Sequence, residues 1–104
     1  MKTHYRQGDV LLLKVDELPK EAVPDAQEEQ TRIVLAYGEV TGHAHALSTA
    51  HAALYKHDQE RYLVAEPGAT LVHEEHSAIV LEPGVYRVVR QREYSPREVR
   101  FVAD

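Results

Sequence analysis

The sequence has no cysteine among its 104 residues, and it has no tryptophan either. The lack of cysteine excludes disulfide bonds and thiolate metal ligands, so imidazole and carboxylate groups are the only strong metal ligands that the chain offers. No run of about 18 apolar residues occurs, which excludes a transmembrane helix. Residues 1–7 lack the apolar stretch and cleavage site of a signal peptide. We therefore expect a cytoplasmic protein with no membrane partner.

Basic charge is also scarce, since the net charge is −5 with histidine neutral. A protein that coats nucleic acid needs clustered lysine and arginine against the phosphates, so the composition disfavours that class. A local exception is a late strand-like segment that carries several arginines and tyrosines, namely Tyr86, Arg87, Arg90, Arg92 and Tyr94. Arginine with tyrosine on one β surface suits nucleotides or single-stranded RNA. An RNA- or nucleotide-binding β domain is therefore an alternative, beside a plain solvated strand face.

Short strand-like segments separated by turn signals make up most of the chain, and no amphipathic helical pattern occurs. They are residues 10–15, 31–37, 42–48, 53–56, 61–64 and 85–94. The first is predicted to open at Gly8-Asp9, and the loop 57–60 to join a hairpin. Residues 16–30 are predicted to form an exposed acidic loop with at most one helical turn. The pattern predicts one all-β domain over residues 1–104, a small β-barrel or sandwich of about eight short antiparallel strands.

The tripeptide Glu-Pro-Gly occurs twice, at residues 66–68 and 82–84. Proline presets the first central position of a type II turn, and glycine supplies the positive φ of the second. Two copies are too few for a solenoid, which needs at least about three repeats. We expect two similar strand–turn–strand corners.

Histidine is abundant, with seven residues, and four of them form two closely spaced pairs. The first pair is His43 and His45, directly after Gly42. Residues two apart on a strand point to the same face, so both imidazoles enter one space. Gly42 lets the backbone turn just before the pair. His-x-His on a strand thus supplies two converging ligands of a metal site.

The second pair is His73 and His76, which flank Glu74-Glu75. If the two glutamates form a hairpin turn, the histidines lie directly opposite each other. If the segment is one helical turn, residues i and i+3 also share a face. Either conformation brings the imidazoles together. The glutamates are candidates to orient a ligand through its second nitrogen, or to act as catalytic acid or base beside a metal.

Several interpretations of these histidines stay open. The pairs form one shared metal site, form two unrelated polar surface patches, or serve acid–base chemistry or a proton switch without metal. His51 is a further candidate to line the same cavity. A site of neutral imidazoles suits a divalent transition metal, with Zn, Ni, Fe, Cu and Mn all open. Four histidines without an open position suit structure or sensing, whereas three plus water suit catalysis.

Two family resemblances follow from these motifs. Gly38-x4-His43-x-His45 resembles the first cupin motif, and Pro67-Gly68-x4-His73 resembles the second. The resemblance covers roughly residues 38–85 and implies a metal-binding β-barrel with His43, His45 and His73 as ligands. The cupin glutamate after the second histidine is absent, and His76 is its possible replacement. The strings GEVTGHAH, HEEH and QREY also resemble those of small uncharacterised bacterial and phage proteins.

Together these observations predict a metal-binding β domain with a histidine-rich site. We expect either a metal-dependent enzyme acting on a small molecule or nucleotide, or a non-catalytic metal- or ligand-binding module. The number of ligands distinguishes the two, because catalysis needs an open coordination position. The expected partners are a small-molecule ligand and a second copy of the chain in a homodimer, since a small β domain with an apolar edge tends to associate.

Overall fold

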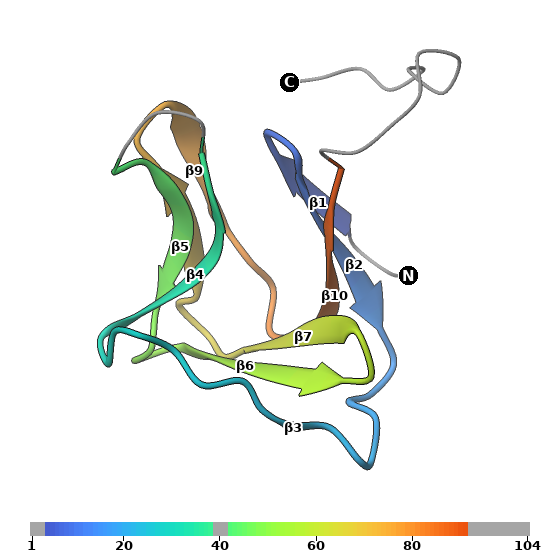
Figure 1. Cartoon of the computed structure of the whole chain (residues 1–104). Helices are drawn as coiled ribbons and strands as arrows, with labels where there is room; N and C mark the ends of the chain where they lie inside the picture. The colour runs from blue at the N-terminus through green and yellow to red at the C-terminus, as the bar shows by residue number, and fades with distance from the viewer. Residues whose placement is uncertain (1–3, 39–41, 92–104) are drawn as a thin grey trace.

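The computed structural model describes residues 4–38 and 42–91, and these residues form ten β-strands and no helix (Figure 1). The strands are short and every strand pair is antiparallel. No helix in this part of the chain is long and apolar enough to cross a membrane. The predicted all-β fold of short antiparallel strands is therefore confirmed.

The larger sheet has six strands in the order β1-β2-β10-β7-β6-β3. Their bounds are β1 His4–Gln7, β2 Val10–Val15, β10 Gly84–Arg90, β7 Glu60–Ala65, β6 Ala52–His57 and β3 Val23–Pro24. The last strand of the described chain thus lies between the second and the seventh, and its register sets Arg90 opposite Val10. This pairing brings the end of β10 beside the turn that joins β1 to β2.

The smaller sheet has four strands in the order β4-β5-β8-β9. Their bounds are β4 Arg32–Tyr37, β5 Ala44–Ser48, β8 Thr70–His73 and β9 His76–Val80. A bulge shifts the register of β4 and β5 between Val34 and Ala36, just where Ala36 pairs with His45. A bulge bends its strand and re-aims neighbouring side chains, and this one lies beside a candidate metal ligand.

The two sheets face each other across an apolar core and do not join into a closed barrel. The largest fully buried side chains come from both sheets, including Leu12, Leu63 and Tyr86 from one and Ile33 and Leu47 from the other. Figure 1 shows the β1–β2 turn and the β8–β9 turn at the same end of the molecule, on opposite sheets. This end of the molecule therefore has a turn from each sheet, and these two turns frame the site described below.

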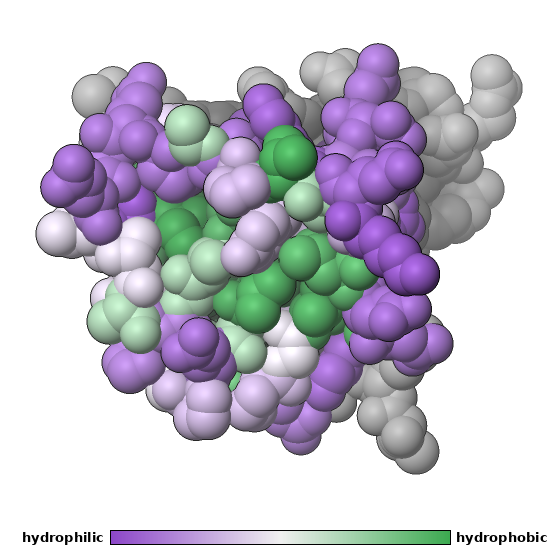
Figure 2. Space-filling view, turned by 90° about the horizontal axis from the view of Figure 1, so that it is seen from below, coloured by the Kyte–Doolittle hydropathy of each residue, from purple (hydrophilic) through white to green (hydrophobic). Residues whose placement is uncertain are grey.

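The opposite end of the molecule presents β3, β6 and β7. Figure 2 views this end and shows apolar side chains gathered in the middle of the face, with hydrophilic side chains around them. Val23 on the two-residue edge strand β3 is 49 % exposed. The four paired histidines lie away from this face, at the end framed by the two turns.

Several local predictions needed correction. The first strand of the fold is β1, so Gly8-Asp9 forms a two-residue turn between β1 and β2 rather than the start of the first strand. The β6–β7 hairpin is also tighter than predicted, because His57 pairs with Glu60 and only two residues remain in the turn. Residues 16–30 contain no helical turn but contribute β3. The predicted end of the late strand, residues 92–94, lies outside the described residues.

The two Glu-Pro-Gly segments are not equivalent. In the first, Gly68 has φ +98° and the N–H of Ala69 donates to the carbonyl of Glu66 at 3.0 Å, as a type II turn requires. In the second, Gly84 has φ +151° and is already the first residue of β10. The predicted turn is thus confirmed in one copy, whereas the other leads directly into a strand.

Candidate functional site: a histidine cluster between two hairpin turns

The four paired histidines meet in one cluster. His45 lies on β5 with His43 just before it, while His73 ends β8 and His76 begins β9. The ring centre of His73 is 4.3 Å from that of His45, 4.8 Å from that of His76 and 5.8 Å from that of His43. The rings of His45 and His76 are 5.7 Å apart and nearly parallel. The two pairs therefore share one space, with His73 at its centre.

The turn between β8 and β9 explains how the second pair converges. His73 and His76 are direct partners in the β8–β9 ladder, so Glu74-Glu75 is a two-residue hairpin turn. This is the first of the two conformations that the sequence allowed. Neither glutamate has a positive φ, so the turn is not of the primed type that glycine and asparagine favour. The register shifts by one residue between Leu71 and His73, which accommodates this less usual turn.

Glycines allow backbone to approach the rings from two sides. A Cβ on Gly8 would lie 3.0 Å from Nε2 of His76 and 3.2 Å from Cε1 of His45. A Cβ on Gly38 would lie 3.1 Å from Nε2 of His73. Gly8 also has φ +60°, which suits the first central residue of a type II′ hairpin turn. The β1–β2 turn thus contacts the cluster in a way that a larger residue would prevent.

Gln7 fixes the orientation and the tautomer of His45. The side-chain amide of Gln7 is buried and donates from Nε2 to the carbonyls of Leu71 at 3.2 Å and Ser77 at 2.9 Å. Its Oε1 is therefore the atom that lies 2.8 Å from Nδ1 of His45, and it must accept a hydrogen bond from the N–H of that nitrogen. A neutral His45 then has its lone pair on Nε2, the nitrogen that lies 3.6 Å from Oδ1 of Asp9.

His45 is also held in the neutral form. It is 3 % exposed, and burial together with the positive charge that His73 can carry lowers its pKa from 6.5 to about 4, against the opposing effect of Asp9. Near pH 7 the imidazole is uncharged. Neutral imidazole with a free Nε2 lone pair is the form that binds metal ions.

The β8–β9 turn makes different contacts with His43 and His73. Nδ1 of His43 is buried and lies 3.1 Å from a carboxylate oxygen of Glu75, although no described group meets it in hydrogen-bond geometry. Nδ1 of His73 accepts the backbone N–H of Glu75 at 3.0 Å. A neutral His73 therefore carries its proton on Nε2. In this arrangement Nε2–H of a neutral His73 is a hydrogen-bond donor, whereas Nε2 of a neutral His45 has a lone pair.

Glu74 connects the hairpin turn to the start of β5. Its Oε1 accepts the backbone N–H of Ala44 at 3.0 Å. This backbone hydrogen bond, followed by one from the N–H of Glu74 itself, lowers the pKa of the Glu74 carboxyl. Glu74 is thus a carboxylate that holds His43 and His45 in place through their strand. Glu75, with its oxygen beside His43, is the glutamate closer to an imidazole.

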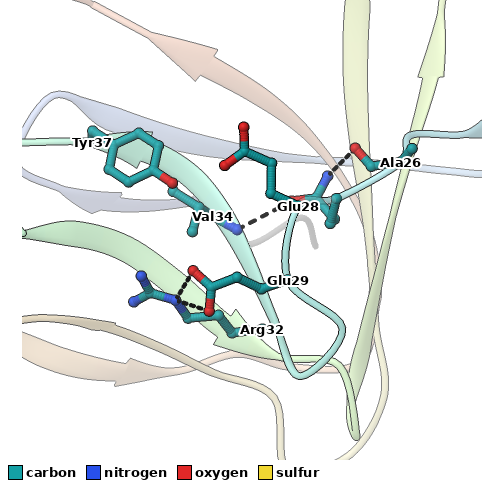
Figure 3. Close-up of a pocket in the computed structure, with 7 residues that line it drawn as sticks. Ala26, Glu28, Glu29, Arg32, Val34 and Tyr37 are labelled. Carbon is teal, nitrogen blue, oxygen red and sulfur yellow. Dashed lines mark hydrogen bonds and ion pairs between the residues drawn. The ribbon is translucent and has the colours of Figure 1, made fainter.

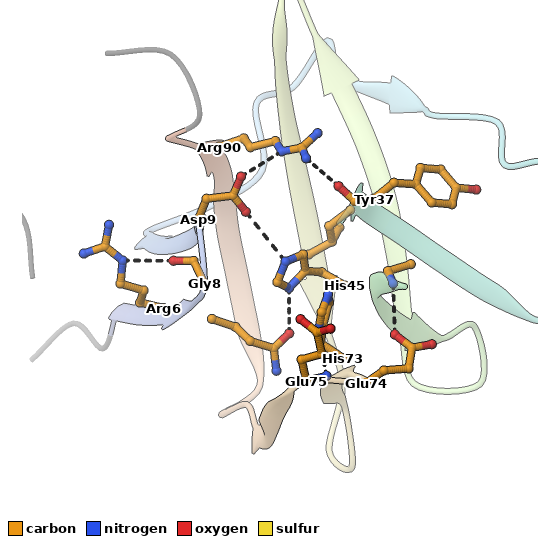
Figure 4. A network of polar contacts seen from close by, with 12 residues as sticks. Arg6, Gly8, Asp9, Tyr37, His45, His73, Glu74, Glu75 and Arg90 are labelled. Atoms are coloured by element: carbon orange, nitrogen blue, oxygen red, sulfur yellow. Dashed lines mark hydrogen bonds and ion pairs between the residues drawn. The ribbon is translucent and has the colours of Figure 1, made fainter. Parts of the chain in front are cut away.

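Figure 4 shows two further polar residues at the site: Asp9, which sequence reasoning did not identify, and Arg90, which it assigned to the arginine–tyrosine surface. Oδ1 of Asp9 lies 3.6 Å from Nε2 of His45, and Oδ2 accepts the Nε–H of Arg90 at 3.1 Å. Arg90 also donates to the backbone carbonyl of Tyr37. The only sequence signal for Asp9 was the pair Gly8-Asp9 itself, because Gly-Asp suits the two central positions of a type II′ turn. Gln7, which precedes it, carried no signal.

Other predicted site residues lie elsewhere. His51 is exposed and its ring rests on Gly68, where a Cβ would lie 3.1 Å from its Nδ1. It follows the far end of β5 and makes no ring contact with the cluster among the contacts described. The predicted arginine–tyrosine surface is also incomplete, because Tyr86 is fully buried in the core. Arg92 and Tyr94 lie outside the described residues.

No three His, Asp or Glu side chains among residues 4–38 and 42–91 surround one point as ligands of a metal ion do. The rings are near one another, but their nitrogens do not converge. The orientation of His73, with its Nδ1 turned to the Glu75 backbone, is one visible reason. The arrangement is a cluster of imidazoles that needs ring rotation before it can ligate a metal.

Two hollows lie near these elements. One, of about 500 Å³, is open and borders the cluster, with a lining of Arg6, Gln7, Glu75, His76, Ser77 and Ile79. The other, of about 130 Å³, lies against β4 and includes the side chain of Tyr37 (Figure 3). In this second hollow Arg32 donates from Nε to both carboxylate oxygens of Glu29 at 3.0 Å. The first hollow is the one that reaches an imidazole.

A family model described as a domain of unknown function (DUF8820) matches residues 6–91. The match spans both hairpin turns and all four clustered histidines. No curated protein and no solved structure matches the chain. Since the family model covers well over half of its length, this chain belongs to the DUF8820 family of domains of unknown function.

Proposed function

We propose that this domain binds a divalent transition-metal ion at the cluster of His43, His45, His73 and His76. The observation that carries the proposal is the state of His45. Oε1 of Gln7 accepts the hydrogen bond of its Nδ1–H, burial keeps the ring neutral, and Nε2 is left with a lone pair. Metal-binding histidines are oriented in this manner, through a hydrogen bond from the nitrogen that does not bind the metal.

The spacing of the rings supports the proposal. Two imidazoles on one tetrahedral ion, each with its nitrogen about 2.1 Å from the metal, have ring centres about 5 Å apart. The measured separations of 4.3 to 5.8 Å bracket this value. What differs from a ligated site is the direction of the rings. Rotation about the χ2 angle of a histidine is soft, so the other three rings can turn toward an ion while Gln7 holds His45.

The ligand chemistry favours a borderline transition metal. Imidazoles suit Zn, Ni, Fe and Cu, and a carboxylate at the site extends the range to Mn. Mg and Ca prefer oxygen ligands, which the cluster does not supply in number. His73 is the least prepared ligand, because binding through Nε2 requires its proton to move and the Glu75 N–H to lose its acceptor. We therefore expect His45 to matter more than His73.

The open hollow beside His76 favours a small-molecule ligand next to the metal. An ion held by three of the histidines keeps a position open toward such a ligand, and a metal-dependent enzyme acting on a small molecule or nucleotide follows from that arrangement. Glu75 is then the carboxylate placed to accept or donate a proton. A non-catalytic metal- or ligand-binding module is the second candidate, and it follows if all four imidazoles bind the ion.

The test uses protein without an affinity tag, stripped with chelator and titrated with Zn(II), Co(II), Ni(II) and Mn(II), with bound metal measured by elemental analysis after desalting. We expect one equivalent of at least one metal. His45→Ala should lose most of the affinity and His76→Ala part of it. His51→Ala is the matched control, because it removes an imidazole outside the cluster, and should bind as wild type does.

Two results would count against the proposal. Wild type that retains none of the four metals removes it outright. Equal affinity losses in His45→Ala and His51→Ala would place any bound metal elsewhere. The cytoplasmic location, the homodimer and the cupin resemblance stay predictions from the sequence. For the RNA-binding alternative, Tyr86 is buried and Arg90 is paired with Asp9, so we expect no RNA affinity that depends on either residue.

A further inference from the structure

We infer that Asp9, on the β1–β2 turn, is an oxygen ligand of the metal at the histidine cluster, with Arg90 as its positioning residue. The inference rests on the proposed metal binding and adds a ligand from the opposite sheet. It converts a site made only of imidazoles into one of mixed nitrogen and oxygen ligands. The geometry around His45 and Asp9 carries it in three steps.

The first step concerns which atoms face each other. The hydrogen bond to Oε1 of Gln7 keeps the proton of a neutral His45 on Nδ1, so Nε2 of that tautomer presents a lone pair. The atom opposite, Oδ1 of Asp9, belongs to a carboxylate and is also an acceptor. The two atoms are 3.6 Å apart. With a neutral ring, two acceptors face each other across a short gap, and a positive centre between them makes this arrangement favourable.

The second step concerns what fits the gap. Two ligand atoms that are each about 2.1 Å from a tetrahedral ion lie about 3.4 Å apart, close to the separation observed. A direct hydrogen bond fits less well, because 3.6 Å exceeds the usual N–H···O range. A water with both contacts at 2.8 Å would have to donate at roughly 80°, well below its bond angle of about 105°. A metal ion suits the distance best.

The third step concerns how Asp9 is held. Its Oδ2 accepts the Nε–H of Arg90 at 3.1 Å, and its backbone carbonyl accepts the N–H of Gln91 at 2.8 Å. Arg90 is itself fixed by the carbonyl of Tyr37 on the other sheet. The carboxylate is therefore clamped through one oxygen, and the other oxygen is directed at His45 (Figure 4). Outer-shell contacts of this kind orient carboxylate ligands.

The absence of cysteine from the chain allows a direct spectroscopic test. The probe is Co(II), added to the tag-free Asp9→Cys variant under reducing conditions. A thiolate bound to Co(II) gives a sulfur-to-metal charge-transfer band in the near ultraviolet, and in this variant only position 9 can supply it. We expect the band at one equivalent of Co(II). The control is Asp58→Cys, on an exposed turn, which should show wild-type Co(II) absorption without the band.

Asp9→Asn and Arg90→Gln complete the test. Asn keeps the shape but not the charge of the ligand, and we expect its Co(II) affinity to fall by more than the about 10- to 100-fold typical of an outer-shell loss. The loss of Co(II) affinity in Arg90→Gln should lie within that range, and the visible spectrum of its Co(II) complex should be unaltered. If wild type binds Co(II), but Asp9→Asn binds equally well or Asp9→Cys binds without the band, Asp9 is not a ligand and the histidine site stands. If wild type binds no metal, both proposals fail.

Discussion

Two hairpin turns close on the histidine cluster from opposite sheets, and they are built differently. The β8–β9 turn carries its chemistry in its own sequence, with a histidine at each end and two glutamates between them. The β1–β2 turn, residues 7–10, has no histidine and supplies Gln7 and Asp9 beneath and beside His45. The β8–β9 turn presents candidate ligands, whereas the β1–β2 turn orients His45, a candidate ligand that lies on β5.

The difference shows what a site needs beyond its ligands. Imidazoles brought together by a tight turn are close but need not point at a common centre, since Nδ1 of His73 is turned to the backbone of Glu75. His45 has one orientation because a buried amide with two other hydrogen bonds holds its second nitrogen. The orientation of this candidate ligand therefore comes from the turn that has no conspicuous motif. The predictions below test this division between the two turns.

The largest effect is expected from Gln7→Leu, which keeps the size of the side chain and removes its amide. The change leaves the carbonyls of Leu71 and Ser77 and the Nδ1–H of His45 without partners in the interior. We expect a loss of about 2–4 kcal/mol in the free energy of unfolding. Urea denaturation measures it, with Gln59→Leu on the exposed β6–β7 turn as a control that should change little. Equal stability of the two variants would show that the β1–β2 turn does not support the cluster.

The second prediction concerns pH. The pKa of His45 is about 4 in the folded protein and rises to its ordinary value of 6.5 on unfolding, so the unfolded chain binds more protons between these values. Stability from this group is fully present above pH 6.5 and falls as the pH is lowered toward 4, with a slope of up to about 1.4 kcal/mol per pH unit. Urea denaturation of metal-free protein should show the slope, and His45→Gln should reduce it. An unchanged slope in His45→Gln would assign the pH dependence to other groups.

A smaller effect is expected from the contact between the two turns. Gly8→Ala and Gly42→Ala both place a side chain at positive φ, but only the first also places a Cβ 3.0 Å from His76, whereas Gly42 has open space around it. We expect Gly42→Ala to cost about 1 kcal/mol and Gly8→Ala about 1–2 kcal/mol. Thermal unfolding compares them. If Gly42→Ala is the more destabilised of the two, the close contact between Gly8 and His76 does not contribute to stability.

The sequence predicted the histidines of this cluster better than the residues that support them. Alternating strands and turn residues were sufficient for the all-β fold, and the spacing of His73 and His76 was sufficient for their convergence. Gln7 and Asp9 were missed because their roles depend on the pairing of β2 with β10 and on the packing of two sheets, which no local pattern encodes. His51, predicted as a further residue of the cavity, lies instead in the connection between β5 and β6, beyond the far end of β5. No local pattern shows at which end of the sheet this connection lies.

The most direct test of the account is a nitrogen-15 NMR measurement of the histidine ring nitrogens during titration with Zn(II). The account predicts that His45 in the metal-free protein is a neutral ring with its proton on Nδ1. One equivalent of Zn(II) should then shift Nε2 of His45 to a metal-bound position, while the rings of His51 and His57 stay unchanged. A His45 that carries its proton on Nε2, or that does not respond to Zn(II) bound by the protein, would contradict it.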